Sequence, residues 1–231
     1  AQVYTGTARY NDALTYASKV IDEGGFTLAP DFVSLFSGDN GVTSAKNEII
    51  YALLAEPFVS QSYGNTTYLV NGSLNAETMT LNDYGATAGW SGHRATKAWY
   101  GLFANSAAGL ATSPDDRAKL FWTAGHSYEM NDYKIWTDGF PSIKFRNSNF
   151  AGGGASTEFS GTDFPLFRLA DAYLIYAECA VRGGGGSTTT ALDYVNMVRA
   201  RSNADAISSG DLNLDFILAE RGREFNFEGQ R

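Results

Sequence analysis

The sequence contains very little cysteine and histidine. Cys179 is the only cysteine among the 231 residues, so the chain can form no internal disulfide and no paired-cysteine zinc site. The two histidines, His93 and His126, do not form the HExxH pattern of zinc hydrolases. We therefore expect no metal and no cofactor. Cys179 lies in an apolar helical pattern, so we predict that it is a small buried side chain.

Clustered positive charge and long apolar runs are also missing. The 17 basic residues form no run and the net charge is −8, which argues against a nucleic-acid partner. The sequence shows no signal peptide and no apolar run of ~20 residues that could span a membrane. Because it begins without methionine and within a helix-like pattern, we expect it to be a piece of a longer protein whose targeting signals lie elsewhere.

Aromatic residues and glycine are abundant. The chain has 13 tyrosines, 15 phenylalanines, 4 tryptophans and 25 glycines. Aromatic rings offer flat faces for the C–H side of a sugar, and neighbouring amides and hydroxyls satisfy its polar groups. Such a composition favours carbohydrate binding.

Helical periodicity is clearest in the last third of the chain. Asp163 and Pro165 stand where a helix start takes a capping acceptor and a proline, and residues 183–186 are glycines that end this helix. A second helix precedes a third that begins at about Leu214. From the spacing of three and four residues, the inward-facing side chains predicted for the three helices include Leu169, Ala172, Tyr173, Tyr176, Ala177, Ala180, Ala191, Leu192, Val195, Val198, Ile217, Leu218 and Phe225.

Three motifs in this region resemble the C-terminal signature of the SusD/RagB family. They are FRLADAYLIYAECA, ALDYVNMVRARS and LAERGREFNFEGQR, in that order within residues 163–231. The resemblance implies a mainly α fold: a TPR-like scaffold of α-α hairpins, or alpha-alpha superhelix, interrupted by an irregular loop-rich excursion.

The resemblance divides the chain, 1–231, into parts of one incomplete SusD/RagB-type domain. Residues 1–25 would end the TPR-like scaffold, with a helix at 9–23 and the tail of another at 1–4. Residues 26–160 would form the irregular ligand-facing excursion, including a buried strand or extended piece within 47–54. Residues 161–231 would form the C-terminal helical region.

The charged residues of the motifs are expected to stabilise the helices rather than to bind a ligand. Arg168 and Asp171 are three residues apart, Glu178 and Arg182 are four apart, and Arg221 can reach residue 224 in the same way. Pairs at this spacing are neighbours on one helix and contribute about 0.2–0.5 kcal/mol each.

Catalytic patterns are weak. Ser91, in GWSGH, fails the G-x-S-x-G pattern of hydrolases because glycine follows it directly. A glycoside hydrolase would need two facing carboxylates, and the candidates are Asp83, Glu129, Asp132 and Asp138. We therefore expect no enzyme activity.

Binding residues are predicted in the excursion. Its aromatic residues Tyr63, Tyr68, Tyr84 and Trp90 alternate with asparagines. From placement and chemistry we predict a ligand site of Tyr63, Tyr84, Trp90, His93 and Arg94, with Tyr63 and Tyr84 exposed. For Trp90, packing inside the excursion is an equally open alternative.

The resemblance also implies a function. The parent would be a non-catalytic, surface-exposed lipoprotein of a Gram-negative outer membrane that captures oligosaccharide or polysaccharide. It would deliver this glycan to a TonB-dependent SusC-like transporter, and its only membrane attachment would be a lipid anchor on the missing N-terminal part. Two alternatives stay open, a TPR-like protein-interaction scaffold and a surface glycoside hydrolase.

Overall fold

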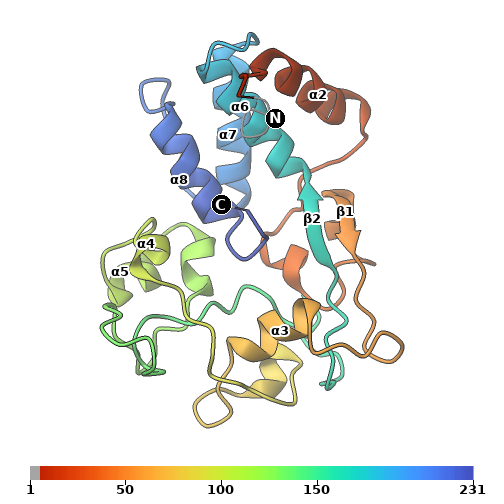
Figure 1. Cartoon of the computed structure of the whole chain (residues 1–231), viewed down its shortest axis with the longest axis vertical. Helices are drawn as coiled ribbons and strands as arrows, with labels where there is room; N and C mark the ends of the chain where they lie inside the picture. Colours follow the sequence, from red (N-terminus) through yellow and green to blue (C-terminus); the bar gives the residue numbers. More distant parts are fainter. Residues whose placement is uncertain (1–5, 231) are drawn as a thin grey trace.

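The computed structural model describes residues 6–230 and is mainly helical (Figure 1), as predicted. The predicted tail of a helix at residues 1–4 lies outside the described residues. Short 3-10 helices occupy Val33–Phe36, Ser44–Asn47, Leu81–Tyr84 and Asp116–Leu120. The other elements are α2 (Tyr10–Glu23), β1 (Ile49–Leu53), α3 (Asn65–Gly72), α4 (Lys97–Tyr100), α5 (Ala107–Thr112), β2 (Phe164–Arg168), α6 (Leu169–Val181), α7 (Thr188–Arg201) and α8 (Leu214–Glu224).

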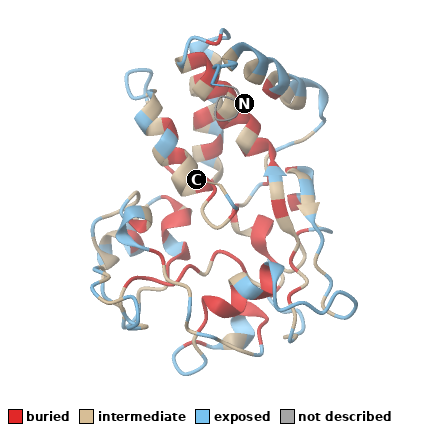
Figure 2. Cartoon of the chain, viewed as in Figure 1, coloured by how far each residue is buried: buried red, intermediate tan, exposed pale blue. Residues whose placement is uncertain are grey.

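Helix α6 is the centre of the helical end of the molecule. It packs against α2, α7 and α8, and Figure 2 shows buried residues along much of its length. Its alanines, including Ala172 and Ala177, let the neighbouring helices approach, while Val195 of α7 and Ile217 of α8 fill the space between them. One predicted core residue is wrong, because Leu218 is 60% exposed.

The start of α6 differs from the prediction. Residues 164–168 form strand β2, which pairs antiparallel with β1, so α6 begins at Leu169 and not near Asp163. Asp163 caps no helix: its carboxylate accepts a hydrogen bond of 2.9 Å from the backbone N–H of Ala55. The predicted strand in 47–54 is confirmed, but it is not buried, since Tyr51 and Leu53 are exposed.

Most of residues 26–160, the predicted excursion, is ordered and lies toward the other end of the molecule from α2 (Figure 1), whereas Phe26 and Leu28 pack against the helical core. The excursion has little regular secondary structure but two apolar clusters of its own. The larger cluster includes Leu35, Phe36 and Phe145, and the smaller one includes Tyr100 and Phe140. Aromatic burial therefore replaces helix packing in this part of the chain.

A buried network of charges joins the two ends. Arg168, at the junction of β2 and α6, is fully buried and forms ion pairs of 2.6 Å with Glu48, 2.9 Å with Glu224 and 2.7 Å with Glu228. Lys144 of the excursion reaches Glu228 at 2.6 Å. Residues from four distant segments thus meet around one guanidinium.

A second buried cation extends the network. The Arg117 side chain lies 2.8 Å from Glu220 and 2.9 Å from Glu224. Burial alone would raise the pKa of the Glu224 carboxyl. The positive charges of Arg201, Arg168 and Arg117 outweigh this effect and hold the pKa of Glu224 well below its usual range. The Glu224 carboxylate therefore stays charged inside the protein.

The network corrects the predicted pairing of the motif charges. Arg168 does not pair with Asp171, which instead accepts from Arg221 at 2.7 Å on another helix. Because Arg221 pairs with Asp171, the predicted pair of Arg221 with Glu224 is not formed. Only the Glu178–Arg182 pair, at 2.7 Å, is confirmed as a contact within one helix.

Candidate functional site

Helix α3 forms the base of an exposed aromatic surface. Its inner face is fixed to a distant segment: the Thr66 hydroxyl donates to the carbonyl of Thr162 at 2.6 Å, and Thr67 Oγ1 accepts from the N–H of Ser160 at 2.8 Å. Both threonines are buried, so Tyr68 on the opposite side of α3 faces outward. The rotation of the helix therefore determines which ring is presented to solvent.

Three exposed rings meet at this surface, and we call Tyr63, Tyr68 and Trp90 the aromatic platform. Their exposed fractions are 56%, 53% and 40%. The Trp90 ring lies between the other two, with a centroid distance of 6.2 Å to each and interplanar angles of 58° to Tyr63 and 55° to Tyr68. The platform is therefore a row of tilted faces rather than one flat sheet.

The backbone around Trp90 is held against the end of α3. The Trp90 N–H donates to the carbonyl of Asn71 at 2.8 Å, and the next N–H, from Ser91, donates to Leu74 at 2.9 Å. A Cβ at Gly89 would lie 2.9 Å from the Leu74 carbonyl, so glycine is what allows this close approach. The alternative that Trp90 packs inside the excursion holds only for its backbone, because the Trp90 ring is exposed.

A segment far along the chain supports Tyr63. The Phe159 ring packs 4.9 Å from the Tyr63 ring, and the Tyr63 hydroxyl donates a hydrogen bond to the carboxylate of Glu158. This bond raises the pKa of the Tyr63 hydroxyl, so it remains protonated and keeps donating near neutral pH. Glu158 is itself exposed.

His93 lies behind the platform. Its ring meets the Tyr68 ring edge to face at 4.3 Å and is half-buried. Burial lowers the pKa of His93, so the imidazole is neutral at pH 7. His93 thus supports the Tyr68 ring from behind without adding charge.

We expect Gly72→Ala to destabilise the site. An added Cβ would lie 2.3 Å from the His93 ring, so that ring and Tyr68 would have to move. The free energy of unfolding, measured in urea, should fall by about 1–3 kcal/mol. Gly92→Ala is the matched control, because its Cβ would have 3.7 Å to its nearest neighbour and should leave stability unchanged. Equal stability of the two variants would contradict this packing.

Two predicted site residues lie away from the platform. The expectation that Tyr84 is exposed is wrong: it is 8% exposed and packs in the larger cluster of the excursion, because the turn at 81–84 directs it inward. The Arg94 guanidinium binds backbone carbonyls instead of facing solvent, with Nε donating to Asp138 at 2.8 Å and Nη2 donating to Tyr133. It also lies over the Trp136 ring, 5.5 Å from the centroid. Arg94 therefore fixes the loop that contains Tyr133 and Asp138.

The structure therefore brings together Tyr63, Trp90 and His93 of the predicted set. Sequence reasoning missed Glu158 and Phe159, because Glu158 lies 95 positions beyond its partner Tyr63 and neither residue carries a local signal. Tyr68 could have been selected, because it stands among the asparagines and tyrosines of the predicted binding segment.

Two of the four carboxylates considered for a hydrolase, Glu129 and Asp138, have structural roles in the described chain. Glu129 forms an ion pair of 2.7 Å with Lys97. Asp138 accepts from the backbone N–H groups of Asn131 and Asp132 at 3.0 and 2.9 Å, and these bonds lower its pKa despite the opposing effect of burial. These acids therefore hold a loop in place.

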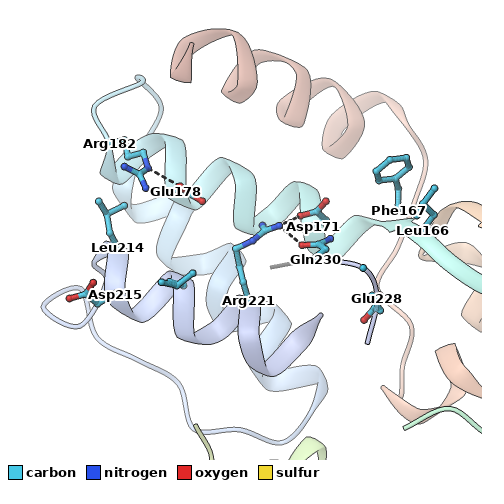
Figure 3. Close-up of a pocket in the computed structure, with 12 residues that line it drawn as sticks. Leu166, Phe167, Asp171, Glu178, Arg182, Leu214, Asp215, Arg221, Glu228 and Gln230 are labelled. Atoms are coloured by element: carbon cyan, nitrogen blue, oxygen red, sulfur yellow. Dashed lines mark hydrogen bonds and ion pairs between the residues drawn. The ribbon is translucent and has the colours of Figure 1, made fainter. Parts of the chain in front are cut away.

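A cavity of about 700 Å³ lies at the helical end, between α6, α8 and residues 228–230 (Figure 3). Its charged groups face one another: Arg221 donates to Asp171 and to Gln230, and Arg182 pairs with Glu178. Because none of the predicted site residues lines the cavity, we assign the candidate site to the aromatic platform.

Within residues 6–230, no group of three or more histidine, cysteine, aspartate or glutamate side chains is arranged to hold a metal ion. No helix there has the length and apolar character needed to cross a membrane.

The chain shares its sequence pattern and its fold with known proteins. The pattern that defines the SusD family matches residues 23–231. The chain belongs to the SusD family. Within this family, the starch-binding protein SusD of Bacteroides thetaiotaomicron is 30% identical to it, in an alignment that covers 100% of this chain and 48% of that protein. The chain thus spans about half the length of this relative.

Solved structures show the same SusD-type fold. The surface glycan-binding protein A of Bacteroides thetaiotaomicron in complex with laminarihexaose is similar with a TM-score of 0.67 and 20% identity, over 96% of this chain and 48% of that one. The corresponding protein of Bacteroides uniformis gives a TM-score of 0.65 and 21% identity, over 96% and 44%. By name, these relatives are binding proteins.

Proposed function

We propose that this chain belongs to a cell-surface protein that binds a glycan without cleaving it, and that the aromatic platform contacts the glycan. The observation that carries the proposal is the grouping of three exposed rings, Tyr63, Tyr68 and Trp90, on an ordered excursion. Exposed rings of this size are costly to leave in water unless a ligand covers them. The names of the relatives, a starch-binding protein and surface glycan-binding proteins, support a sugar as that ligand.

The chemistry of the platform suits a sugar chain. Each ring offers a face for the C–H side of one sugar unit, and the tilt between neighbouring rings suits a chain that curves. Polar groups stand beside the rings, among them the Glu158 carboxylate, which accepts hydrogen bonds from hydroxyls.

We further propose that the parent protein captures its glycan for uptake. In this proposal it is held at the outer membrane by a lipid anchor outside the present sequence, and it passes oligosaccharide to a TonB-dependent SusC-like transporter. The support is the membership of the SusD family and the match of the C-terminal motifs.

A protein-binding scaffold is the second candidate. An apolar groove of about 340 Å³ runs between α2, α6 and the β-ribbon, and Tyr16 and Phe167 at its edges are exposed.

The test is a calorimetric titration of this chain and of its parent against neutral oligosaccharides, including malto- and laminari-oligosaccharides. Binding by both would support a glycan site in these residues. Binding by the parent alone would move essential contacts into the rest of the protein. If neither the chain nor its parent binds a glycan, and a protein is found that binds the groove, the scaffold would be favoured.

A further inference from the structure

Glu158 is the charged group closest to the aromatic platform. Its carboxylate accepts the hydroxyl proton of Tyr63. The backbone on its C-terminal side is fixed, because Phe159 packs against Tyr63 at 4.9 Å and the Ser160 N–H donates to Thr67 at 2.8 Å. The position of this carboxylate at the rim is therefore determined by the fold and not by a free loop.

The negative charge of Glu158 is not balanced by a neighbouring cation. Within residues 6–230 no ion pair to Glu158 is formed, and no lysine or arginine lies over the rings of the platform. Arg94, the closest basic residue in sequence to Trp90, is bound to backbone carbonyls, and the adjacent His93 is neutral. A ligand on the platform therefore meets one uncompensated carboxylate.

We propose that Glu158 makes the platform selective for neutral glycans: its carboxylate orients the Tyr63 ring, accepts hydrogen bonds from sugar hydroxyls, and repels glycans that carry carboxylate or sulfate groups. A carboxylate has about four acceptor sites, and Tyr63 uses one of them, so the others are open to hydroxyls. A like charge brought to this rim weakens binding by Coulomb repulsion. The inference rests on the glycan-binding function proposed above.

The test compares polymers that share a backbone and differ in charge. Soluble starch and laminarin are each paired with their carboxymethyl derivatives, and dissociation constants of the parent protein are measured by affinity electrophoresis at low salt. Glu158→Gln keeps an acceptor for Tyr63 and removes the charge. We expect it to leave binding of the neutral polymers within about threefold and to tighten binding of the charged derivative about fivefold, an advantage that 0.5 M salt removes.

The matched control is Glu23→Gln, which makes the same change in net charge at an exposed position on α2 at the other end of the molecule. This control should leave the ratio between the dissociation constants of the neutral polymer and of its carboxymethyl derivative unchanged. An equal change of the ratio in both variants, or no change in Glu158→Gln, would overturn the selectivity role while leaving the proposed function intact. If the wild-type parent bound no neutral polymer, both proposals would fall together.

Discussion

Glycan affinity is expected to fall about tenfold or more when Trp90 is replaced by alanine. The Trp90 ring is the one that contacts both other rings of the platform, with centroids 6.2 Å from Tyr63 and 6.2 Å from Tyr68, so we expect a glycan bound across the platform to contact Trp90. Large aromatic side chains at the centre of a contact surface carry most of the binding free energy. Isothermal titration with the best neutral oligosaccharide measures the effect.

Tyr16→Ala is the control for this experiment. Tyr16 is also an exposed aromatic residue, but it lies on α2, at the opposite end of the molecule from α3 (Figure 1). Its replacement should leave glycan affinity within about twofold, because it removes exposed aromatic area without touching the platform. Equal losses in Tyr16→Ala and Trp90→Ala, or no loss in either, would remove the platform as the binding site.

Stability is expected to fall by about 3–5 kcal/mol in Arg168→Met, because breaking a buried ion pair leaves charge without a partner. The Arg168 side chain donates to Glu48, Glu224 and Glu228, all buried, and each of these carboxylates would lose a cation. Urea denaturation of the variant measures the loss. If the variant does not fold, Arg168→Lys provides the measurable case, because it keeps the charge and loses the fork of donors.

Arg182→Met is the matched control. Arg182 binds Glu178 at 2.7 Å, but this pair is partly exposed and lies within one helix. Its removal should cost about 0.5 kcal/mol or less. If Arg168→Met and Arg182→Met had similar effects, the network would not be what joins the excursion to the helices.

The helices of the chain were predictable because their periodicity is local. The spacing of apolar residues placed α2, α6, α7 and α8, and the glycines after α6 marked its end. The start of α6 was missed because residues 164–168 find a partner in β1, more than a hundred positions earlier. Capping residues indicate where a helix is able to begin. Here residues 164–168 pair with a distant strand instead, so the helix begins only at Leu169.

The charge network shows the same limit more sharply. Arg168 and Asp171 have the spacing of a helical pair, but Arg168 is the last residue of the strand and its partners come from distant segments. Spacing in the sequence shows which side chains are able to meet within a helix. It cannot show that an arginine is enclosed by residues that only the fold brings together.

The exposed rings of the candidate site were predictable in part for a related reason. Tyr63 and Trp90 were selected because aromatic residues cluster in one polar segment of the sequence, and their rings are exposed and in contact. Tyr84 belongs to the same segment, but its ring is needed in the cluster around Phe36 and Phe145. Composition indicates that rings gather in a region, whereas the backbone around each ring determines which of them remain exposed.

The most direct test of the central claim is whether a bound glycan shields Trp90. The chain has four tryptophans, and the indole N–H groups of Trp99, Trp122 and Trp136 are buried, so acrylamide should quench mainly Trp90. We expect a saturating neutral oligosaccharide to lower the acrylamide quenching of the parent protein, and the Trp90-dependent part of this change to disappear in Trp90→Phe. An oligosaccharide that binds tightly and leaves the quenching of Trp90 unchanged would place the glycan elsewhere and contradict the account.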